Sequence, residues 1–138
     1  IKSGIFIFIF SSGKISPIVP VHPKIISFEE ILDIFFTIHD PTTLNYQGYD
    51  IGTRYRSAIF THSESQHLKA EQKITELEES KTWPNPIVTE LSKLSDFFVA
   101  ENYHQNYFDN NINQPYCQIV VSPKIDKLNK KFKHKLKN

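Results

Sequence analysis

The chain has 138 residues, of which 39% are hydrophobic and 22% charged, and its formal net charge is +1. This length suffices for one domain with a buried core, and this composition argues against a disordered protein. The small net charge gives no global attraction to nucleic acid or to a membrane, and a single cysteine, Cys117, excludes a disulfide framework and a cysteine-rich zinc site. We therefore expect a cytoplasmic protein.

Residues 1–20 differ from the rest of the chain. Ile5–Phe10 is a six-residue run of β-favouring apolar residues, which is too short for a membrane span of roughly 20 residues. Pro17 and Pro20 interrupt the next apolar stretch and argue against a central strand there. The chain also contains no methionine. We expect an incomplete or misjoined reading frame at this end and assign residues 1–20 to no domain.

The first clear element is a helix. Ser27 and Glu30 have the spacing of a capping box, in which each side chain accepts a hydrogen bond from the other residue's amide. Apolar residues then recur at helical spacing, namely Phe28, Ile31, Leu32, Phe35 and Ile38. The pattern predicts a core helix from about 28 to 39, which ends because Pro41 disfavours helical geometry at the residue before it.

The middle of the chain alternates between loops, strands and a second helix. Thr42–Thr53 contains two glycines among polar residues and reads as a structured loop, and Ser57–Thr61 reads as a buried strand. Ser63–Gln66 is a second capping box, which predicts a helix to about Glu79. Three apolar residues would form its inner face: Ala70, Ile74 and Leu77.

The last part of the chain predicts two short strands and a final helix. Ile87–Leu91 and Gln118–Val121 are the strand candidates, and between them Asp96–Ala100 is a turn into a short helical stretch near Glu101–Tyr107. Ser122-Pro123 would cap the last helix, with apolar residues at spacings of three and four: Ile125, Leu128, Phe132 and Leu136. This order of elements predicts an α+β or α/β domain with a mixed sheet.

Three polar and aromatic clusters are the candidates for a site. They are His39–Ser57, Tyr103–Tyr107 and Pro115–Cys117. Tyrosines, a histidine, an aspartate and a thiol from these clusters would line one pocket, since loops bounded by regular elements commonly carry sites. His62 and His67 have no partner at the spacing of zinc ligands, so the sequence predicts no metal site.

Several separated blocks give the chain a recognisable family pattern. These blocks are Pro23–Leu32, His39–Asn45, Gln47-Gly48, Asp50, Gly52-Thr53, Tyr55–Phe60, Pro86–Glu90, Ala100-Glu101, Tyr103–Gln105, Tyr107, Tyr116-Cys117 and Pro123-Lys124. In this order they resemble the peptide methionine sulfoxide reductase A family over roughly Val21 to Lys137. We therefore treat 21–138 as a partial domain of that kind.

The resemblance implies a fold and an activity. The fold would be a two-layer α+β domain with a mixed sheet and packed helices, a ferredoxin-like plait, here lacking its first strand and helix. The activity would be reduction of methionine (S)-sulfoxide, in oxidised proteins and as the free amino acid, with thioredoxin as the reductant and without a cofactor. We expect a monomer that binds neither nucleic acid nor membranes.

The resemblance also implies roles for six residues. Tyr55 would donate its hydroxyl to the sulfoxide oxygen, Asp50 would orient a polar group or a water molecule, and Cys117 would be the recycling cysteine. The residues that line the substrate pocket would be His104, Tyr107 and Tyr116.

The chain departs from the family upstream. The family's glycine-cysteine-phenylalanine-tryptophan motif, which supplies the nucleophile and much of the methyl pocket, has no counterpart in residues 1–20. The family's glutamate acid falls near Ile15, where there is no carboxylate, and a second pocket tyrosine is absent. We therefore expect the reductase function of the family but a catalytically deficient polypeptide.

Two other functions are open. A non-catalytic remnant that binds methionine-sulfoxide peptides would keep the pocket wall without the chemistry. A basic-tail interaction protein would use the lysines of the last 15 residues, although a solvated helix face explains these lysines as well.

Overall fold

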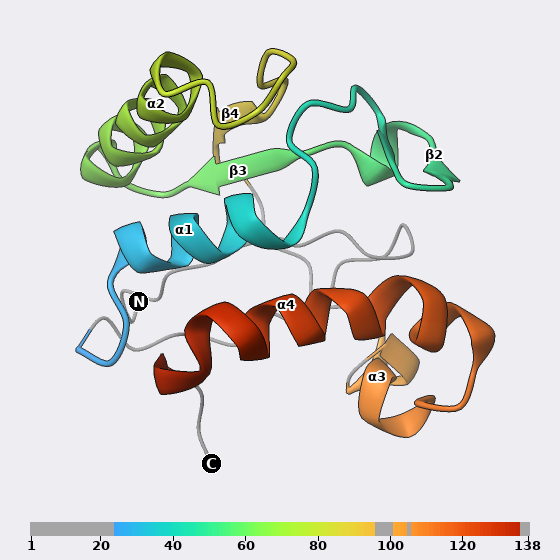
Figure 1. Cartoon of the computed structure of the whole chain (residues 1–138). Coiled ribbons are helices and arrows are strands. Elements are labelled where there is room, and N and C mark those ends of the chain that lie inside the picture. The colour runs from blue at the N-terminus through green and yellow to red at the C-terminus, as the bar shows by residue number, and fades with distance from the viewer. Residues whose placement is uncertain (1–23, 96–100, 105, 136–138) are drawn as a thin grey trace.

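The chain has a mixed α+β fold of helices and short strands (Figure 1). The computed structural model describes residues 24–95, 101–104 and 106–135. The helices are α1 (Phe28–Ile38), α2 (Glu64–Glu79), α3 (Tyr107–Asn110) and α4 (Ser122–Phe132), and the strands are β1 (Tyr46–Gln47), β2 (Asp50–Ile51), β3 (Ala58–Thr61) and β4 (Glu90–Lys93). Short helical turns are η1 (Thr53–Tyr55), η2 (Asn102–His104), η3 (Cys117–Val121) and η4 (Lys133–Lys135), of which η3 is a π-helix and the others are 3₁₀.

Some predictions fall outside the described residues. They concern the run Ile5–Phe10 with Pro17 and Pro20, the turn Asp96–Ala100, and Leu136. Within the described ranges, none of the helices combines the length and apolar composition needed to cross a bilayer.

Helix α1 confirms the predicted capping box. Ser27 Oγ accepts a hydrogen bond from the Glu30 amide at 3.2 Å, and Glu30 Oε2 accepts one from the Ser27 amide at 2.8 Å. These bonds satisfy two backbone donors that a helix otherwise leaves without partners. At the other end His39 is extended, with φ −135° and ψ 169°, so the helix ends one residue before the predicted boundary.

The hydrophobic core is built around α1. Its side chains supply most of the buried cluster, which comprises Phe28, Ile31, Leu32, Phe35, Phe36, Ile59 and Ala70. Figure 1 shows α1 between the layer that contains β3 and α2 and the long helix α4, and it contacts both α2 and α4. The predicted inner face of α2 is confirmed, because Ala70 is fully buried and Ile74 and Leu77 pack against the same cluster.

Strands β3 and β4 form a parallel pair, with Ala58 opposite Glu90. The strand predicted at Ser57–Thr61 is confirmed, but the strand predicted at Ile87–Leu91 begins later, at Glu90. The later start follows from the hydrogen-bond acceptors of the Val88 and Glu90 amides. Val88 donates its amide to Pro41 O at 2.9 Å, and the ladder with β3 begins only where the Glu90 amide reaches Ser57 O at 2.9 Å.

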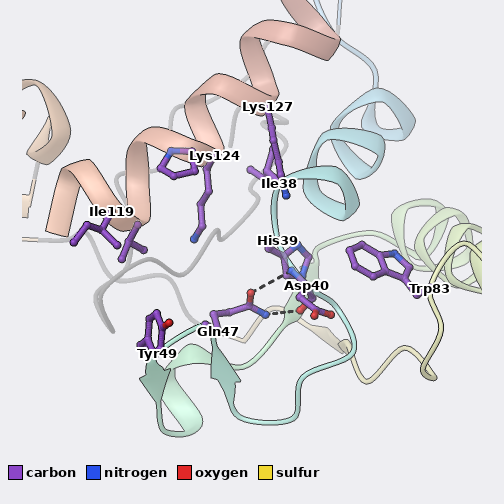
Figure 2. Close-up of a pocket in the computed structure, with 12 residues that line it drawn as sticks. Ile38, His39, Asp40, Gln47, Tyr49, Trp83, Ile119, Lys124 and Lys127 are labelled. Carbon is purple, nitrogen blue, oxygen red and sulfur yellow. Dashed lines mark hydrogen bonds between the residues drawn. The ribbon is translucent and has the colours of Figure 1, made fainter. Parts of the chain in front are cut away.

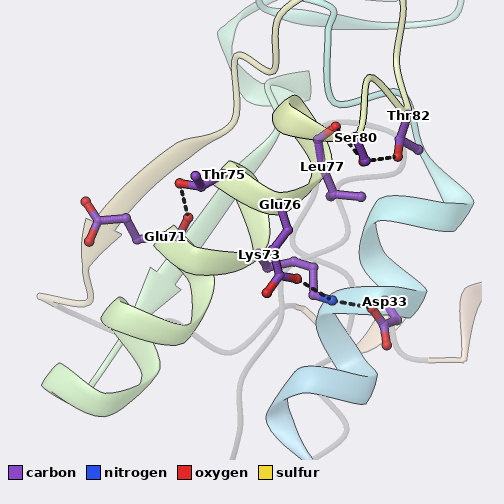
Figure 3. Close-up of polar contacts among 8 residues, drawn as sticks. All are labelled: Asp33, Glu71, Lys73, Thr75, Glu76, Leu77, Ser80 and Thr82. Carbon is purple, nitrogen blue, oxygen red and sulfur yellow. Dashed lines mark hydrogen bonds and ion pairs between the residues drawn. The ribbon is translucent and has the colours of Figure 1, made fainter.

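Ion pairs join α1 to α2 across the edge of the core. Lys73 Nζ lies 3.0 Å from Asp33 Oδ1 and 3.5 Å from Glu76 Oε2, and the hydrogen bond with Asp33 raises the pKa of Lys73 (Figure 3). The capping box expected at Ser63 is only half formed: Ser63 Oγ accepts from the Gln66 amide at 3.2 Å, while Gln66 Oε1 accepts from the His62 amide instead.

The strand predicted at Gln118–Val121 is wrong, because this segment is the π-helix η3 and runs directly into α4. Ser122 has helical angles and no side-chain cap, so the predicted cap at Ser122-Pro123 is wrong as well. Proline cannot donate to the preceding turn, and a wide turn is one way in which a helix accommodates it. Here the Ser122 amide reaches back to Cys117 O, just before Pro123.

The helical stretch expected near Glu101–Tyr107 is split between η2 and α3. The break lies at Asn106, whose φ of 51° and ψ of 35° are left-handed. Asparagine tolerates this region better than most residues, because its short polar side chain forms local hydrogen bonds.

The loop between α1 and β3 contains an antiparallel hairpin of β1 and β2 and has two glycines with positive φ, of which only Gly52 has a conformation that requires glycine. Gly48 is at the hairpin tip with φ +55°, whereas Gly52 has φ +138° and ψ 160°. The first conformation is left-handed helical, which asparagine also adopts, and the second is open essentially only to glycine. The Gly52 amide also donates to Asn45 O at 2.8 Å, which closes the hairpin.

We expect Gly52→Asn to destabilise the chain by about 1–3 kcal/mol, because asparagine cannot adopt this backbone conformation without strain. Urea denaturation measures this loss. Gly48→Asn is the matched control and should change the free energy of unfolding by less than about 1 kcal/mol. Equal losses at both positions would contradict this assignment of backbone strain.

Candidate active site

The loop of residues 40–56 is closed at its base by a buried hydrogen-bond chain. His39 Nε2 and Ser57 Oγ lie 2.7 Å apart, at the two ends of the loop. His39 Nδ1 lies 2.5 Å from Phe35 O, and Ser57 Oγ lies 2.8 Å from Thr89 Oγ1. These hydrogen bonds therefore link the end of α1, the start of β3 and the segment before β4.

The direction of these bonds follows from their acceptors. Because a backbone carbonyl only accepts, His39 Nδ1 carries the proton, and Nε2 of the neutral ring accepts from Ser57. The Ser57 oxygen then accepts from the Thr89 hydroxyl. Burial, helped by the positive charge of Lys124, lowers the pKa of His39 to about 4, although the hydrogen bond with Phe35 O and the charge of Asp40 oppose this shift. The neutral ring is thus the form that the surroundings stabilise.

Side chains within the loop fix its path. Asp40 Oδ1 accepts from the amide and the hydroxyl of Thr42, at 2.9 and 2.6 Å. Gln47 Oε1 accepts from the Asp40 amide at 3.2 Å, and its Nε2 donates to Asp40 O and to Thr43 Oγ1. The amide of Gln47 therefore holds the hairpin against the end of α1.

Asp50 and Tyr116 meet across 66 positions of sequence. The Tyr116 hydroxyl donates to Asp50 Oδ2 at 3.1 Å. Asp50 comes from β2, and Tyr116 lies immediately before η3. Two of the residues predicted for the site are therefore in direct contact, and the hydroxyl is the polar group that Asp50 engages.

Tyr55 is half-buried in η1, a few residues beyond Asp50. Its ring lies 3.7 Å from the position that a Cβ on Gly52 would occupy, and the Arg54 guanidinium is 5.6 Å from the ring centroid. These contacts and the Gly52 carbonyl, which accepts from the Tyr55 amide at 2.9 Å, set the position of the tyrosine.

The other predicted site residues have local partners. Tyr107 donates its hydroxyl to Gln114 Oε1 at 3.1 Å, and buried His104 lies 3.0 Å from Glu101 Oε2. Cys117 is 0% exposed, so its sulfur is not accessible in this conformation.

A cavity of about 400 Å³ lies between α1, the hairpin and α4 (Figure 2), and the predicted site residues Asp50, Tyr55 and Tyr116 are not among those that line it. Its lining residues are Ile38, His39, Asp40, Gln47, Gly48, Tyr49, Trp83, Ile119, Val120, Pro123, Lys124 and Lys127. Apolar side chains line much of the wall, with a few polar groups between them, as in many small-molecule sites.

Sequence reasoning missed Trp83 and Lys124 as parts of this cavity. Trp83 follows α2 and reaches the cavity only through the tertiary fold, so no local pattern marks it. Lys124 was visible in principle, because Cys117, Val121, Ile125 and Leu128 continue one helical stripe and place Lys124 beside it. Within the described part of the chain, no three potential ligands are grouped to hold a metal ion.

Comparisons with known proteins agree with this architecture. A family model for peptide methionine sulfoxide reductase matches residues 18–136. Peptide methionine sulfoxide reductase MsrA of Polynucleobacter asymbioticus is 51% identical over 111 residues, which cover 80% of this chain and 58% of that protein. MsrA of Saccharolobus solfataricus is 50% identical over 114 residues, which cover 83% of this chain and 63% of that protein.

Solved structures match as well. Reduced Mxr1 of Saccharomyces cerevisiae has a TM-score of 0.65 and 42% identity, covering 70% of this chain and 52% of that chain. Methionine sulfoxide reductase A of Corynebacterium diphtheriae has a TM-score of 0.56 and 28% identity, covering 70% and 50%. These likenesses are to oxidoreductases. The chain belongs to the peptide methionine sulfoxide reductase family, and it spans about 60% of the length of the two curated relatives.

We expect the buried His39 to make stability depend on pH. Above about pH 6.5 the ring is neutral in both states. Between pH 6.5 and 4 the unfolded chain binds a proton that the folded chain does not, so the free energy of unfolding falls as the pH is lowered, by about 3 kcal/mol. Urea denaturation across this range measures the fall.

His39→Gln should remove this part of the pH dependence, at the cost of a lower stability at pH 7. His62→Gln, at an exposed histidine, is the matched control and should keep the slope of the parent chain. An unchanged slope in His39→Gln would contradict the neutral, buried histidine.

Proposed function

We propose that the chain carries part of the active site of a peptide-methionine (S)-S-oxide reductase. The observation that carries this proposal is the hydrogen bond from Tyr116 to Asp50, which follows Tyr49, a lining residue of a largely apolar cavity. A sulfoxide needs both parts: polar groups for its oxygen and an apolar wall for its methyl group. The family membership and the names of the relatives support the same substrate.

The proposed chemistry is a two-electron reduction. A cysteine thiolate attacks the sulfoxide sulfur, and the oxygen is transferred to the cysteine and protonated, which gives a sulfenic acid and methionine. Tyr55 donates to the oxygen as negative charge develops on it, and Asp50 holds the hydroxyl of Tyr116 in the site. A second thiol then forms a disulfide with release of water, and thioredoxin reduces that disulfide.

The proposal includes the extent and topology of the domain. We propose that residues 21–138 form a partial reductase domain and that residues 1–20 lie outside it. The domain would follow the ferredoxin-like plait with a mixed sheet, without the first strand and helix. The parallel β3–β4 pair and the helices α1 and α2 that pack beside it support this topology.

We also propose that this 138-residue polypeptide is catalytically deficient by itself. Cys117 is its single thiol and is fully buried, so no thiolate stands ready to meet the sulfoxide. An unpositioned thiol loses the orientation and electrostatic contributions that supply most of the rate. In the proposal Cys117 is the recycling cysteine, and His104 and Tyr107 line the substrate pocket.

A non-catalytic protein that binds methionine-sulfoxide peptides is the second candidate function, and the presence of the cavity favours it.

Binding of the two sulfoxide epimers tests the proposal. We expect the full chain to bind methionine (S)-sulfoxide at least about tenfold more tightly than the (R) epimer and methionine, because a site that donates to one oxygen position penalises the alternatives. Amide chemical shifts measured by NMR during titration give these affinities. Tyr55→Phe should reduce the preference, and Tyr46→Phe, a matched hydroxyl removal on the hairpin, should not. Equal binding of all three ligands would refute the proposed site.

A turnover assay with dithiothreitol separates the two candidates. We expect no reduction of methionine (S)-sulfoxide above the background of the thiol alone. Turnover by this chain that disappears in Cys117→Ser would overturn the proposed deficiency and make Cys117 the nucleophile.

A further inference from the structure

Several acceptors that line the cavity already receive hydrogen bonds from the protein. Asp40 Oδ1 accepts two hydrogen bonds from Thr42, and Gln47 Oε1 accepts from the Asp40 amide. His39 Nε2 accepts from Ser57. These side chains therefore face the cavity with much of their accepting capacity already satisfied.

Two donors in the same lining have no acceptor. Trp83 Nε1 is buried and has no hydrogen-bond partner among the described residues. Lys124 has neither an ion pair nor a hydrogen bond with any residue that the structure describes, although most lysines of this kind would be solvated or paired. Two donors without an acceptor in one cavity suit a ligand that accepts hydrogen bonds.

Lys124 is placed to act on a ligand rather than on the protein surface. Figure 2 shows its side chain extending from α4 toward the hairpin, where Gln47 and Tyr49 lie. Burial lowers the pKa of Lys124, the nearby negative charge of Asp50 raises it, and the positive charge of Lys127 lowers it. Lys124 thus interacts electrostatically with Asp50 without forming an ion pair with it, and its ammonium group has lost part of its hydration.

We propose that Lys124 is the carboxylate-binding residue of this cavity and holds the acidic group of a methionine-sulfoxide ligand whose sulfoxide lies at Asp50, Tyr116 and Tyr55. This inference rests on the proposed function and deepens it by naming the class of substrate. The carboxylate comes either from the main chain of the free amino acid or from an acidic side chain next to the oxidised methionine in a peptide.

A carboxylate fits Lys124 better than a neutral oxygen does. An ammonium group that is partly removed from water gains most from a full negative charge, since charge-assisted hydrogen bonds are roughly twice as strong as neutral ones. The apolar wall that includes Ile38 and Val120 suits the aliphatic part of the ligand. The volume of about 400 Å³ is within the range of small-molecule pockets.

The test compares ligands that differ only in charge. Methionine (S)-sulfoxide and its carboxamide are titrated into the full chain by NMR. We expect the carboxylate to bind about tenfold more tightly than the amide, because only the carboxylate forms a hydrogen bond between two charged groups with Lys124. Lys124→Met should make the two affinities equal, and Lys124→Arg should retain a preference for the carboxylate.

Lys130→Met is the matched control. It removes the same charge from the same helix, but Lys130 does not line this cavity. This variant should keep the full preference, so that a loss confined to Lys124→Met reports a local contact and not the general field of α4. The amide spectra of all variants check that each one is folded.

Capped, amidated tripeptides distinguish the two sources of the carboxylate. One carries glutamate before the oxidised methionine and the other carries glutamine. If only the free amino acid shows a preference that depends on Lys124, the main-chain carboxylate is the ligand group. If the glutamate peptide binds more tightly than the glutamine peptide and this preference depends on Lys124, the site recognises an acidic residue next to the oxidised methionine.

The outcomes separate this inference from the proposed function. A carboxylate preference that survives in Lys124→Met, or no binding of either ligand at millimolar concentration, overturns the role of Lys124. A preference that requires Lys124 but is the same for methionine and its sulfoxide supports the carboxylate site and refutes the reductase site.

Discussion

The hydrogen bond between His39 Nε2 and Ser57 Oγ is the constraint on which the site depends. Residues 40–56 hold Asp50 and Tyr55, and without a fixed base this long connection would have many conformations. The histidine ends the most buried helix and the serine begins a core strand, so the loop is attached at both ends to the rigid part of the molecule. His39 accepts this bond only when its ring is neutral, so the conformation of the loop depends on the protonation state of His39.

The second half of the site depends on packing between distant segments. Tyr116 immediately precedes η3 and α4, and α4 contacts α1, so the hydrogen bond with Asp50 joins two segments that are distant in sequence. Lys135 and Glu30 form an ion pair at the other end of the same contact, and Lys135 lowers the pKa of Glu30 to about 2. The hydrogen bond between Asp50 and Tyr116 therefore depends on how the C-terminal helix packs as well as on the local sequence.

Local signals predicted what local physics determines. The capping box at Ser27 and the apolar stripe of α1 require no tertiary information, and both were predictable. The segment Gln118–Val121 was not, because its β-branched residues favour a strand, whereas the hydrogen bond from the Ser122 amide to Cys117 O and the continuation into α4 make it helical. The contact of Tyr116 with Asp50 spans 66 positions, so the sequence placed the two residues in one pocket but gave no local signal that they touch.

The π-helix before Pro123 has a consequence for the direction of the residues that follow it. A π turn holds one more residue than an α turn, which is equivalent to inserting a residue into a regular helix. Each residue of an α-helix advances by about 100°, so such an insertion rotates the downstream side chains by that angle relative to the upstream ones. Tyr116 and Lys124 stand on opposite sides of this change of phase, yet both are directed to the neighbourhood of Asp50. The irregular turn thus acts as a spacer that brings two side chains to the same carboxylate.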